Sequence, residues 1–497
     1  MPRHVSRSKI REDLALLARR YDCVRTYTVS DGMDQVPAVA AEFGLSVLVG
    51  AWIGRDPLLN EAEISRVLRV AREHRGVVRA IVVGNEVLLR HELTPTQLSA
   101  LIRRVGTESG LPVTYADVWG YWVHHRAVAD AVSFVTVHII PYWDDDPVGI
   151  DDVIPYVDRL YAEMRRRFPG KEVLIGETGW PSVGRPRGAN APGRVNQARY
   201  IREFTALAAA HGIPYNLIEA FDQPWKQPPE GTVGGYWGLQ DVDGRAKFSF
   251  SGPIVEEPMA PQVLRVAFGT ALLAALLGAW AFPRSRMRAA VICGAAGLFA
   301  VTVGARQWLY LTLGNTNLVD WVATVGVAGL GWLALCRVLP LLATNSIGSG
   351  GRPAPRGAVA AWRARRRGLR SSGIPDATLR LSLLVCASYV SLGLAFAGRH
   401  RDFPVWLFLP GVLAVAAWAW LRPSEHGAAL RTDRAIEEWL LAAWLVAAAV
   451  LILWGERFAN LPSFAWSLSV LGLALSILVP VRLEPAREQQ AAQHANA

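Results

Sequence analysis

Seven apolar runs among the first 259 residues alternate with stretches of helical periodicity, and this alternation limits the possible fold more than any other feature. The runs lie at 23–29, 45–53, 80–87, 113–119, 134–143, 173–180 and 215–225. The stretches between them, such as EAEISRVLRVAREH and TPTQLSALIRRVG, space their apolar residues as amphipathic helices do. Strand, helix, strand at this spacing predicts a parallel sheet, and seven repeats favour a (β/α)8 TIM barrel over a doubly wound sheet. A helical pattern at 8–20 has no strand before it, so the missing eighth strand is expected to be the first.

The second half of the chain predicts a membrane domain. Its long apolar runs raise the mean hydropathy of the whole chain to +0.21, which is high for a wholly soluble protein. About 20 residues in a helix match a hydrocarbon core of about 30 Å. Seven runs are expected to cross the membrane, at 261–282, 289–313, 319–339, 381–397, 403–421, 439–454 and 464–481.

Charge separates the same two halves. Residues 1–259 carry a net charge of −2, and residues 260–497 carry +12. Alternate loops of the membrane part hold sixteen arginines on one side and three on the other. The positive-inside rule places the richer side in the cytoplasm, so the first half is expected in a bacterial periplasm, outside the inner membrane. No nucleic-acid motif accompanies the basic excess, and nucleic acid is not an expected partner.

The expected organisation therefore has three parts. Residues 1–259 form the barrel, 260–482 form the transmembrane helical domain of about seven spans, and 483–497 form a polar tail. The Arg-rich loop at 340–380, with its GSGGRPAP and RARRRG segments, is expected to be a flexible cytoplasmic linker or a basic patch on anionic lipid. The first twenty residues have no apolar export signal, which agrees with the missing first strand in predicting a shortened N-terminus.

Acidic and aromatic residues gather where the predicted strands end, which is where TIM barrels carry their active sites. Glu86 follows the run at 80–87, and Glu177 ends VLIGE in the run at 173–180. Two carboxyl groups across one barrel mouth match glycoside hydrolysis, in which one protonates the leaving oxygen and the other attacks the anomeric carbon. Aromatic side chains suit the apolar faces of sugar rings, and the net charge gives no reason to expect an anionic polymer.

Two motifs resemble glycoside hydrolase family 17. KEVLIGETGWPSVG at 171–184 is similar to the family signature, and VVGNEV at 82–87 is similar to its acid/base strand. The resemblance covers about residues 8–250 and includes Arg25-x-Tyr27 and Pro141-Tyr142. It is strongest to bacterial members whose barrel is attached to a membrane part and handles periplasmic β-1,3-glucan.

The resemblance implies an eight-stranded barrel, retention of configuration, Glu86 as acid/base and Glu177 as nucleophile, with Asn85 binding the sugar 2-hydroxyl. No cofactor and no metal site are expected. The expected partners are a β-glucan, the lipid bilayer and a glucan synthase. The remaining candidate substrate-binding residues at the strand ends are Arg25, Tyr27, Asp117, Trp119, Tyr142, Trp180, Asp222, Trp225 and Lys226.

Several alternatives stay open at this point. Gln223 stands where plant members carry a further Glu, and Ile140 replaces a Tyr, so cleavage mode is not transferred from the family. The enzyme either hydrolyses glucan or transfers it to another sugar. A catalytically idle glucan-binding or scaffold module of a synthesis or export complex is the alternative function, and a transporter is a weaker one because no inverted repeat supports it. His138, within the run at 134–143, is expected to be a core histidine of the barrel.

Overall fold

The computed structural model describes most of the chain. The described residues are 4–344, 357–366, 374–396, 402–420, 435–456, 458 and 460–478. They fall into two compact units. The first holds residues 1–184, 189–224 and 233–256, and the second holds 185–188, 225–232 and 257–497.

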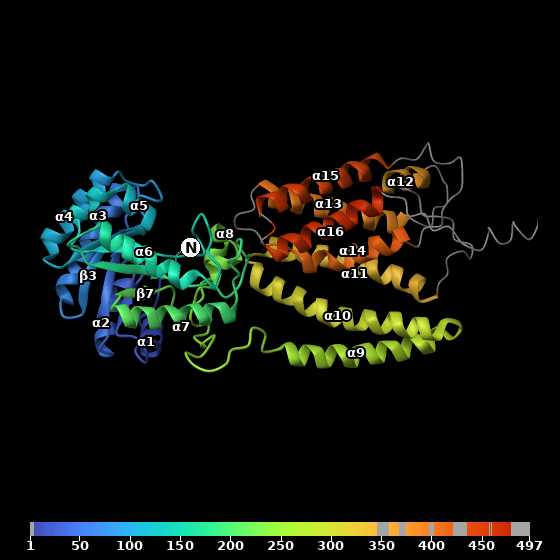
Figure 1. Ribbon diagram of the computed structural model, residues 1–497, viewed down its shortest axis with the longest axis horizontal. Helices are drawn as coiled ribbons and strands as arrows, with labels where there is room; N and C mark the ends of the chain where they lie inside the picture. The colour runs from blue at the N-terminus through green and yellow to red at the C-terminus, as the bar shows by residue number, and fades with distance from the viewer. Residues whose placement is uncertain are drawn as a thin grey trace, which may run out of the picture. The chain divides into compact units, whose positions relative to one another are not determined.

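The first unit is a nearly closed barrel of seven parallel strands, coloured blue to green in Figure 1. The strands are β1 (Cys23–Arg25), β2 (Ser46–Ala51), β3 (Val78–Asn85), β4 (Val113–Val118), β5 (Val135–His138), β6 (Val173–Thr178) and β7 (Tyr215–Leu217). Each pairs with its sequence neighbours, in the order β1 to β7, and no β1–β7 pairing is present within 4–344. The seven predicted strands and the barrel-type fold are thus confirmed.

Helices cover the outside of these strands (Figure 1). They are α1 (Arg7–Leu17), α2 (Val36–Glu42), α3 (Pro57–Glu73), α4 (Pro95–Ser109), α5 (Trp119–His124), α6 (Val153–Arg167) and α7 (Arg194–His211). The single turn α8 (Gln227–Glu230) groups with the second unit. α1 precedes β1, as the sequence predicts. The start of α4 is stabilised by a capping box between Thr94 and Gln97.

Three strands, β1, β5 and β7, end at least four residues before their predicted ends. β5 ends at His138 instead of continuing to 143, because Pro141 has no backbone N–H and the chain turns there, with Trp143 N–H donating to Ile140 at 2.9 Å. β7 ends at Leu217, and the residues predicted as its end instead form a 3-10 turn at Pro224–Lys226. The apolar residues beyond these strand ends lie in loops. Hydrophobicity alone does not distinguish an apolar loop residue from a strand residue.

The second unit is helical. Its helices are α9 (Ala260–Ala281), α10 (Arg286–Gly314), α11 (Leu318–Thr344), α12 (Ala358–Arg366), α13 (Ile374–Phe396), α14 (Val405–Trp420), α15 (Ile436–Gly455) and α16 (Leu461–Leu478), coloured green to red in Figure 1. In the described residues, each of the seven apolar runs contributes one helix. Six of these helices are long and apolar enough to cross a membrane, and α14 is shorter than the span predicted there.

The loop expected at 340–380 needs correction. α11 continues to Thr344, α13 already begins at Ile374, and α12 lies between them, so RARRRG begins inside a helix. GSGGRPAP at 348–355 and the expected tail at 483–497 lie outside the described residues.

A buried ion pair joins two of these helices. Arg380, counted above as a loop arginine, lies in α13 and donates from Nε and Nη2 to the carboxylate of Glu438 in α15, both at 3.0 Å. The two side chains are 4% and 1% exposed. In this pair, two parallel hydrogen bonds join the guanidinium to the carboxylate, so each charge is balanced by its partner. Ionised groups persist in a protein interior when they are paired in this way.

Candidate active site

Two carboxylates lie at the same edge of the barrel. Glu177 is the fifth residue of β6, with a side chain 9% exposed, and Glu86 follows the last residue of β3, with a side chain 24% exposed. Glu86 has φ +52°, in the left-handed region that non-glycine residues seldom occupy. Such backbone strain persists only where the surrounding fold imposes it and is concentrated at functional sites.

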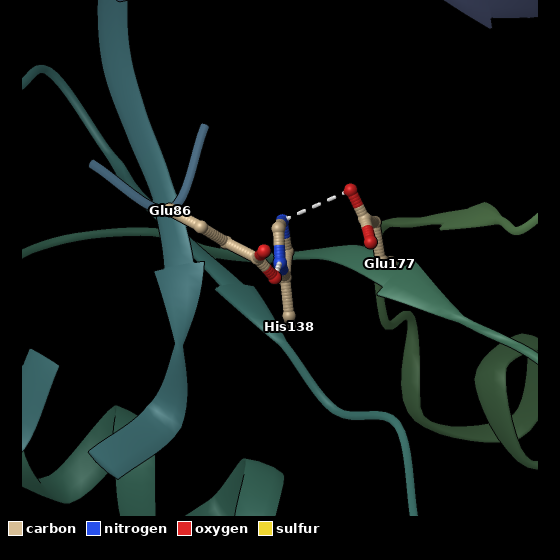
Figure 2. Close-up of side chains that lie close together, drawn as sticks. All are labelled: Glu86, His138 and Glu177. Atoms are coloured by element: carbon tan, nitrogen blue, oxygen red, sulfur yellow. Dashed lines mark hydrogen bonds and ion pairs between the residues drawn. The ribbon is translucent and has the colours of Figure 1, made fainter. Parts of the chain in front are cut away.

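The carboxyl groups flank a histidine that sequence reasoning assigned to the core. Figure 2 shows the imidazole of His138, the last residue of β5, standing between Glu86 and Glu177. Its Nδ1 lies 3.0 Å from Glu86 Oε1 and its Nε2 lies 3.4 Å from Glu177 Oε1. One oxygen of each carboxylate and one imidazole nitrogen lie within 4.8 Å of one another. The structure therefore brings the two predicted carboxylates together and adds a third titratable group.

Arg25 holds this cluster from β1. Its Nη1 donates to the Gly176 carbonyl at 2.7 Å and to Glu177 Oε1 at 3.3 Å, and its Nη2 donates to Asn85 Oδ1 at 2.5 Å. A Cβ on Gly176 would lie 2.3 Å from the Thr136 side chain and 3.2 Å from Arg25 Nη1. The glycine in the VLIGE motif is thus required by the close approach of the arginine and of β5.

Tyr27 donates a hydrogen bond from its hydroxyl to Glu177 Oε1 at 2.9 Å. Tyr27 is 37% exposed, and its ring lies against the guanidinium of Arg25, 4.7 Å from centroid to Cζ. Burial of the hydroxyl and the neighbouring charge of Glu177 hold the pKa of Tyr27 well above its ordinary value. The phenol consequently stays a hydrogen-bond donor over the physiological pH range.

Glu86 is in a different electrostatic situation. Burial acts to raise the pKa of its carboxyl, but the hydrogen bond to His138, the charge that His138 carries when protonated, and the cations Arg90 and Arg25 together lower that pKa. Glu86 is also the more exposed of the two carboxylates. The site therefore contains two different carboxylates. Glu177 is held by hydrogen-bond donors, and Glu86 is more accessible for proton exchange.

Asp117 and Trp119, both predicted to bind substrate, are engaged within the protein. Asp117 is fully buried, accepts from the Tyr115 hydroxyl and from the Val118 N–H, and burial raises its pKa to about 6. Its other contact, from the Leu89 N–H at 3.4 Å, holds the loop after Glu86. Trp119 begins α5 and donates from Nε1 to Asp144 at 3.2 Å.

The predicted aromatic residues divide between the core and a loop cluster. Trp180 is fully buried, stacks on Tyr200 at 5.6 Å and donates from Nε1 to the Ala191 carbonyl, so its ring fills the core. Tyr142 is 1% exposed and packs edge-on against Trp143 and Trp237. These two tryptophan rings are stacked 6.4 Å apart.

Three further candidates, Asp222, Trp225 and Lys226, follow β7. Asp222 forms a buried ion pair with Lys247 at 2.7 Å and caps the Gly238 N–H at 2.9 Å. Burial raises the pKa of Asp222 and lowers that of Lys247, and the pair offsets both shifts in part. Trp225 and Lys226 belong to the segment 225–232 that groups with the helical unit, and the Trp225 ring is 72% exposed.

Glu86, His138 and Glu177 also have the donor types of a metal site. However, the guanidinium of Arg25 already supplies a positive charge 3.3 Å from Glu177 Oε1 and 3.4 Å from His138 Nε2. A second cation at these donors would be repelled by a group that cannot deprotonate. The donor set therefore fits the protein's own cation better than a metal ion.

Comparison with known proteins identifies the same part of the chain. Residues 2–238 match the family model of the BtgE/BtgC glycoside hydrolase domain. A glucan 1,3-beta-glucosidase of Arthroderma benhamiae is 27% identical over 259 residues, covering 48% of this chain and 82% of the relative. One of Saccharomyces cerevisiae is 27% identical over 267 residues, covering 49% and 85%. A solved glycoside hydrolase family 17 β-1,3-glucanosyltransferase of Rhizomucor miehei is 24% identical, with coverage of 49% and 92% and a TM-score of 0.45.

Proposed function

We propose that this protein is a retaining glycosidase acting on β-1,3-glucan, because residues 2–238 match the family model of the BtgE/BtgC glycoside hydrolase domain. Glu177 is the proposed nucleophile and Glu86 the proposed acid/base. The relatives named above are β-1,3-glucosidases and a β-1,3-glucanosyltransferase, which supports a glucan as the substrate class.

The observation that carries the proposal is the short gap between the two carboxyl groups. Their oxygens come within 4.8 Å of each other around His138. Retaining glycosidases hold the two groups about 5 to 5.5 Å apart, whereas inverting enzymes need about 6.5 to 9.5 Å to place a water between sugar and base. The short gap supports the retaining mechanism, in which a carboxylate attacks the sugar directly.

The contacts of Glu177 support its role as the nucleophile. Tyr27 and Arg25 both donate to Oε1, and His138 Nε2 lies nearest the same oxygen. Holding Oε1 fixes the orientation of the carboxylate and leaves Oε2 to attack the anomeric carbon. A nucleophile needs a free oxygen with a fixed direction, and these contacts supply it.

Two steps follow from this arrangement. In the first, Glu177 Oε2 bonds to the anomeric carbon while Glu86 gives its proton to the departing sugar oxygen. In the second, Glu86 takes a proton from the incoming acceptor, whose oxygen displaces Glu177 from the anomeric carbon. Asn85, whose Oδ1 accepts from Arg25, is proposed to present its amide N–H group to the sugar 2-hydroxyl.

Water as acceptor makes the enzyme a hydrolase, and a sugar hydroxyl makes it a transferase that remodels glucan. We favour remodelling at a membrane where glucan is made, with a glucan synthase as the proposed neighbour. The six helices long enough to cross a membrane support attachment to a bilayer. The arginine-rich ends of these helices support the proposed orientation, with the barrel outside the bacterial inner membrane.

The test combines product analysis with two variants. We expect the full-length protein, incubated with laminari-oligosaccharides, to yield the β-anomer first by proton NMR and to yield products longer than the substrate. Glu177→Ala and Glu86→Ala should abolish both, while glucan binding and thermal stability stay close to those of the wild type. Initial release of the α-anomer would contradict retention. Biological activity that survives Glu177→Ala would favour the scaffold alternative instead.

A further inference from the structure

His138 is placed to control how Glu86 carries its proton. Its side chain is fully buried at the end of β5, between β4 and β6, where it pairs with Val118 on one side and Glu177 on the other. The charged and titratable groups that act on it come from four other elements. These groups are Arg25 in β1, Glu86 after β3, Asp117 in β4 and Glu177 in β6.

The two nitrogens of His138 meet different partners. Nδ1 lies 3.0 Å from Glu86 Oε1, a normal hydrogen-bond distance. Nε2 lies 3.4 Å from Arg25 Nη1, which can act only as a donor, and 3.4 Å from Glu177 Oε1, which can act only as an acceptor when ionised. Arg25 also donates to the Gly176 carbonyl and to Glu177, so its position does not depend on the imidazole. Glu177 Oε1 already accepts from Tyr27 and Arg25 and does not need a proton from Nε2. A lone pair on Nε2, facing Arg25, and a proton on Nδ1, facing Glu86, therefore satisfy the neighbours.

A proton on Nδ1 is compatible with both states of the acid/base. When Glu86 is ionised, Nδ1–H donates to Oε1. When Glu86 is protonated, Nδ1–H still donates to Oε1, and the carboxyl proton must then be on Oε2. The opposite tautomer would turn a lone pair toward Oε1, and a protonated Glu86 would direct its proton into the imidazole instead of toward the sugar.

We propose that His138 is neutral, carries its proton on Nδ1, and is the positioning residue that reserves Glu86 Oε2 for the proton transferred in catalysis. The inference rests on the proposed glycosidase function. In the first step the proton leaves Oε2 for the departing sugar oxygen, and in the second Oε2 receives the proton of the acceptor. The Nδ1–H proton stays on the imidazole throughout.

Two substitutions separate the nitrogens. The amide nitrogen of His138→Asn takes the place of Nδ1, whereas that of His138→Gln takes the place of Nε2. With laminari-oligosaccharides we expect kcat/KM to fall by less than about 10-fold in His138→Asn and by about 10²- to 10⁴-fold in His138→Gln, the range of general acid catalysis. Equal losses in the two variants would overturn the proposal.

An activated substrate distinguishes proton positioning from simple packing. A 2,4-dinitrophenyl laminaribioside needs no proton on its leaving group, so the first step in His138→Gln should recover to within about 3-fold of the wild type. The alkaline limb of the kcat/KM profile on natural substrate should also move in His138→Gln. A loss that is the same on both substrates, with an unchanged pH profile, would show that His138 only supports the fold.

Nitrogen-15 NMR of the full chain in lipid bilayers tests the tautomer directly. With histidine labelled and the His138 signals identified by their loss in His138→Asn, we expect a protonated Nδ1 and an unprotonated Nε2 at the pH of assay. A protonated Nε2, alone or in an imidazolium, would overturn the assignment. This measurement needs no turnover, so failure of the proposed function and failure of this inference give different results.

Discussion

Removing the hydroxyl of Tyr27 is the sharpest single change that the site allows. Tyr27→Phe keeps the ring that lies against Arg25 and deletes only the oxygen that donates to Glu177 Oε1 at 2.9 Å. Arg25 then remains on that oxygen at 3.3 Å, too long to fix its direction alone. Glu177 should lose the orientation that points Oε2 at the anomeric carbon.

The size of the effect follows from the kind of bond. A hydrogen bond to a charged group contributes about 1.5 to 3 kcal/mol, which corresponds to a fall in kcat of about 10- to 150-fold. Because burial and Glu177 raise the pKa of Tyr27, the hydroxyl does not ionise between pH 5 and pH 9. The ratio of wild-type to variant kcat should consequently stay constant over this range.

The assay is steady-state hydrolysis and transfer on laminari-oligosaccharides, with Tyr161→Phe as the matched control. Tyr161 donates its hydroxyl to the Val173 carbonyl at 3.2 Å, at the opposite end of β6 from Glu177. We expect that variant to keep kcat within about 2-fold while losing about 1 kcal/mol of stability. A Tyr27→Phe enzyme with unchanged or faster kcat would refute the reasoning about orientation.

Three further changes test other parts of the account. Burial raises the pKa of Asp117 from 3.8 to about 6, so the native state binds the Asp117 proton more tightly than the unfolded chain does. As the pH falls from 7 to 4, the free energy of unfolding of the wild type should therefore rise by up to about 3 kcal/mol relative to that of Asp117→Asn, measured by denaturant titration. Arg380→Met or Glu438→Leu alone should lower stability by about 3 to 5 kcal/mol, and the double variant should recover most of it in thermal unfolding; an additive loss would mean that the pair is not coupled. Gly176→Ala should cost about 1 to 3 kcal/mol and most of the activity, whereas Gly54→Ala, with open space for its Cβ, should be neutral in both measurements.

The sequence predicted the parts of this protein that repeat. Seven apolar runs contain the seven strands, and seven more lie in seven of the described helices of the second unit, α12 being the addition. Burial on both faces of a parallel strand and the thickness of a bilayer both require such runs. Strand ends were predicted less well. Pro141 and Pro224 interrupt apolar stretches that hydrophobicity alone extends into the loops.

Among the predicted site residues, those at or next to the last residue of a strand lie close to one another. Asp222 and Trp180, which lie further along the loops, contact other residues. Glu86, Glu177 and Arg25 meet because parallel strands bring their carboxyl ends to one edge. Asp222 instead pairs with Lys247, a partner 25 residues away in sequence that no local pattern connects to it. Trp180 was predicted to bind substrate, but its ring is buried in the core and stacks on Tyr200.

His138 shows what sequence pattern cannot distinguish. A histidine inside an apolar run has the same appearance whether it fills a core or lies between two acids, since both positions are buried. The signal that could have identified it is its place in the register. It is the last residue of β5 and pairs with Glu177 of β6, so a strand alignment alone brings it beside the nucleophile candidate.

The central claim is that Glu177 forms a covalent bond to the sugar, and trapping that bond tests it most directly. A 2-deoxy-2-fluoro laminaribioside with a 2,4-dinitrophenyl leaving group forms the intermediate but releases it slowly. After incubation with the full-length protein, peptide mass spectrometry should place one fluoroglycosyl adduct on Glu177 and none in Glu177→Ala. An adduct on Glu86 or another residue, or complete turnover of glucan with inverted products and no adduct, would contradict the account.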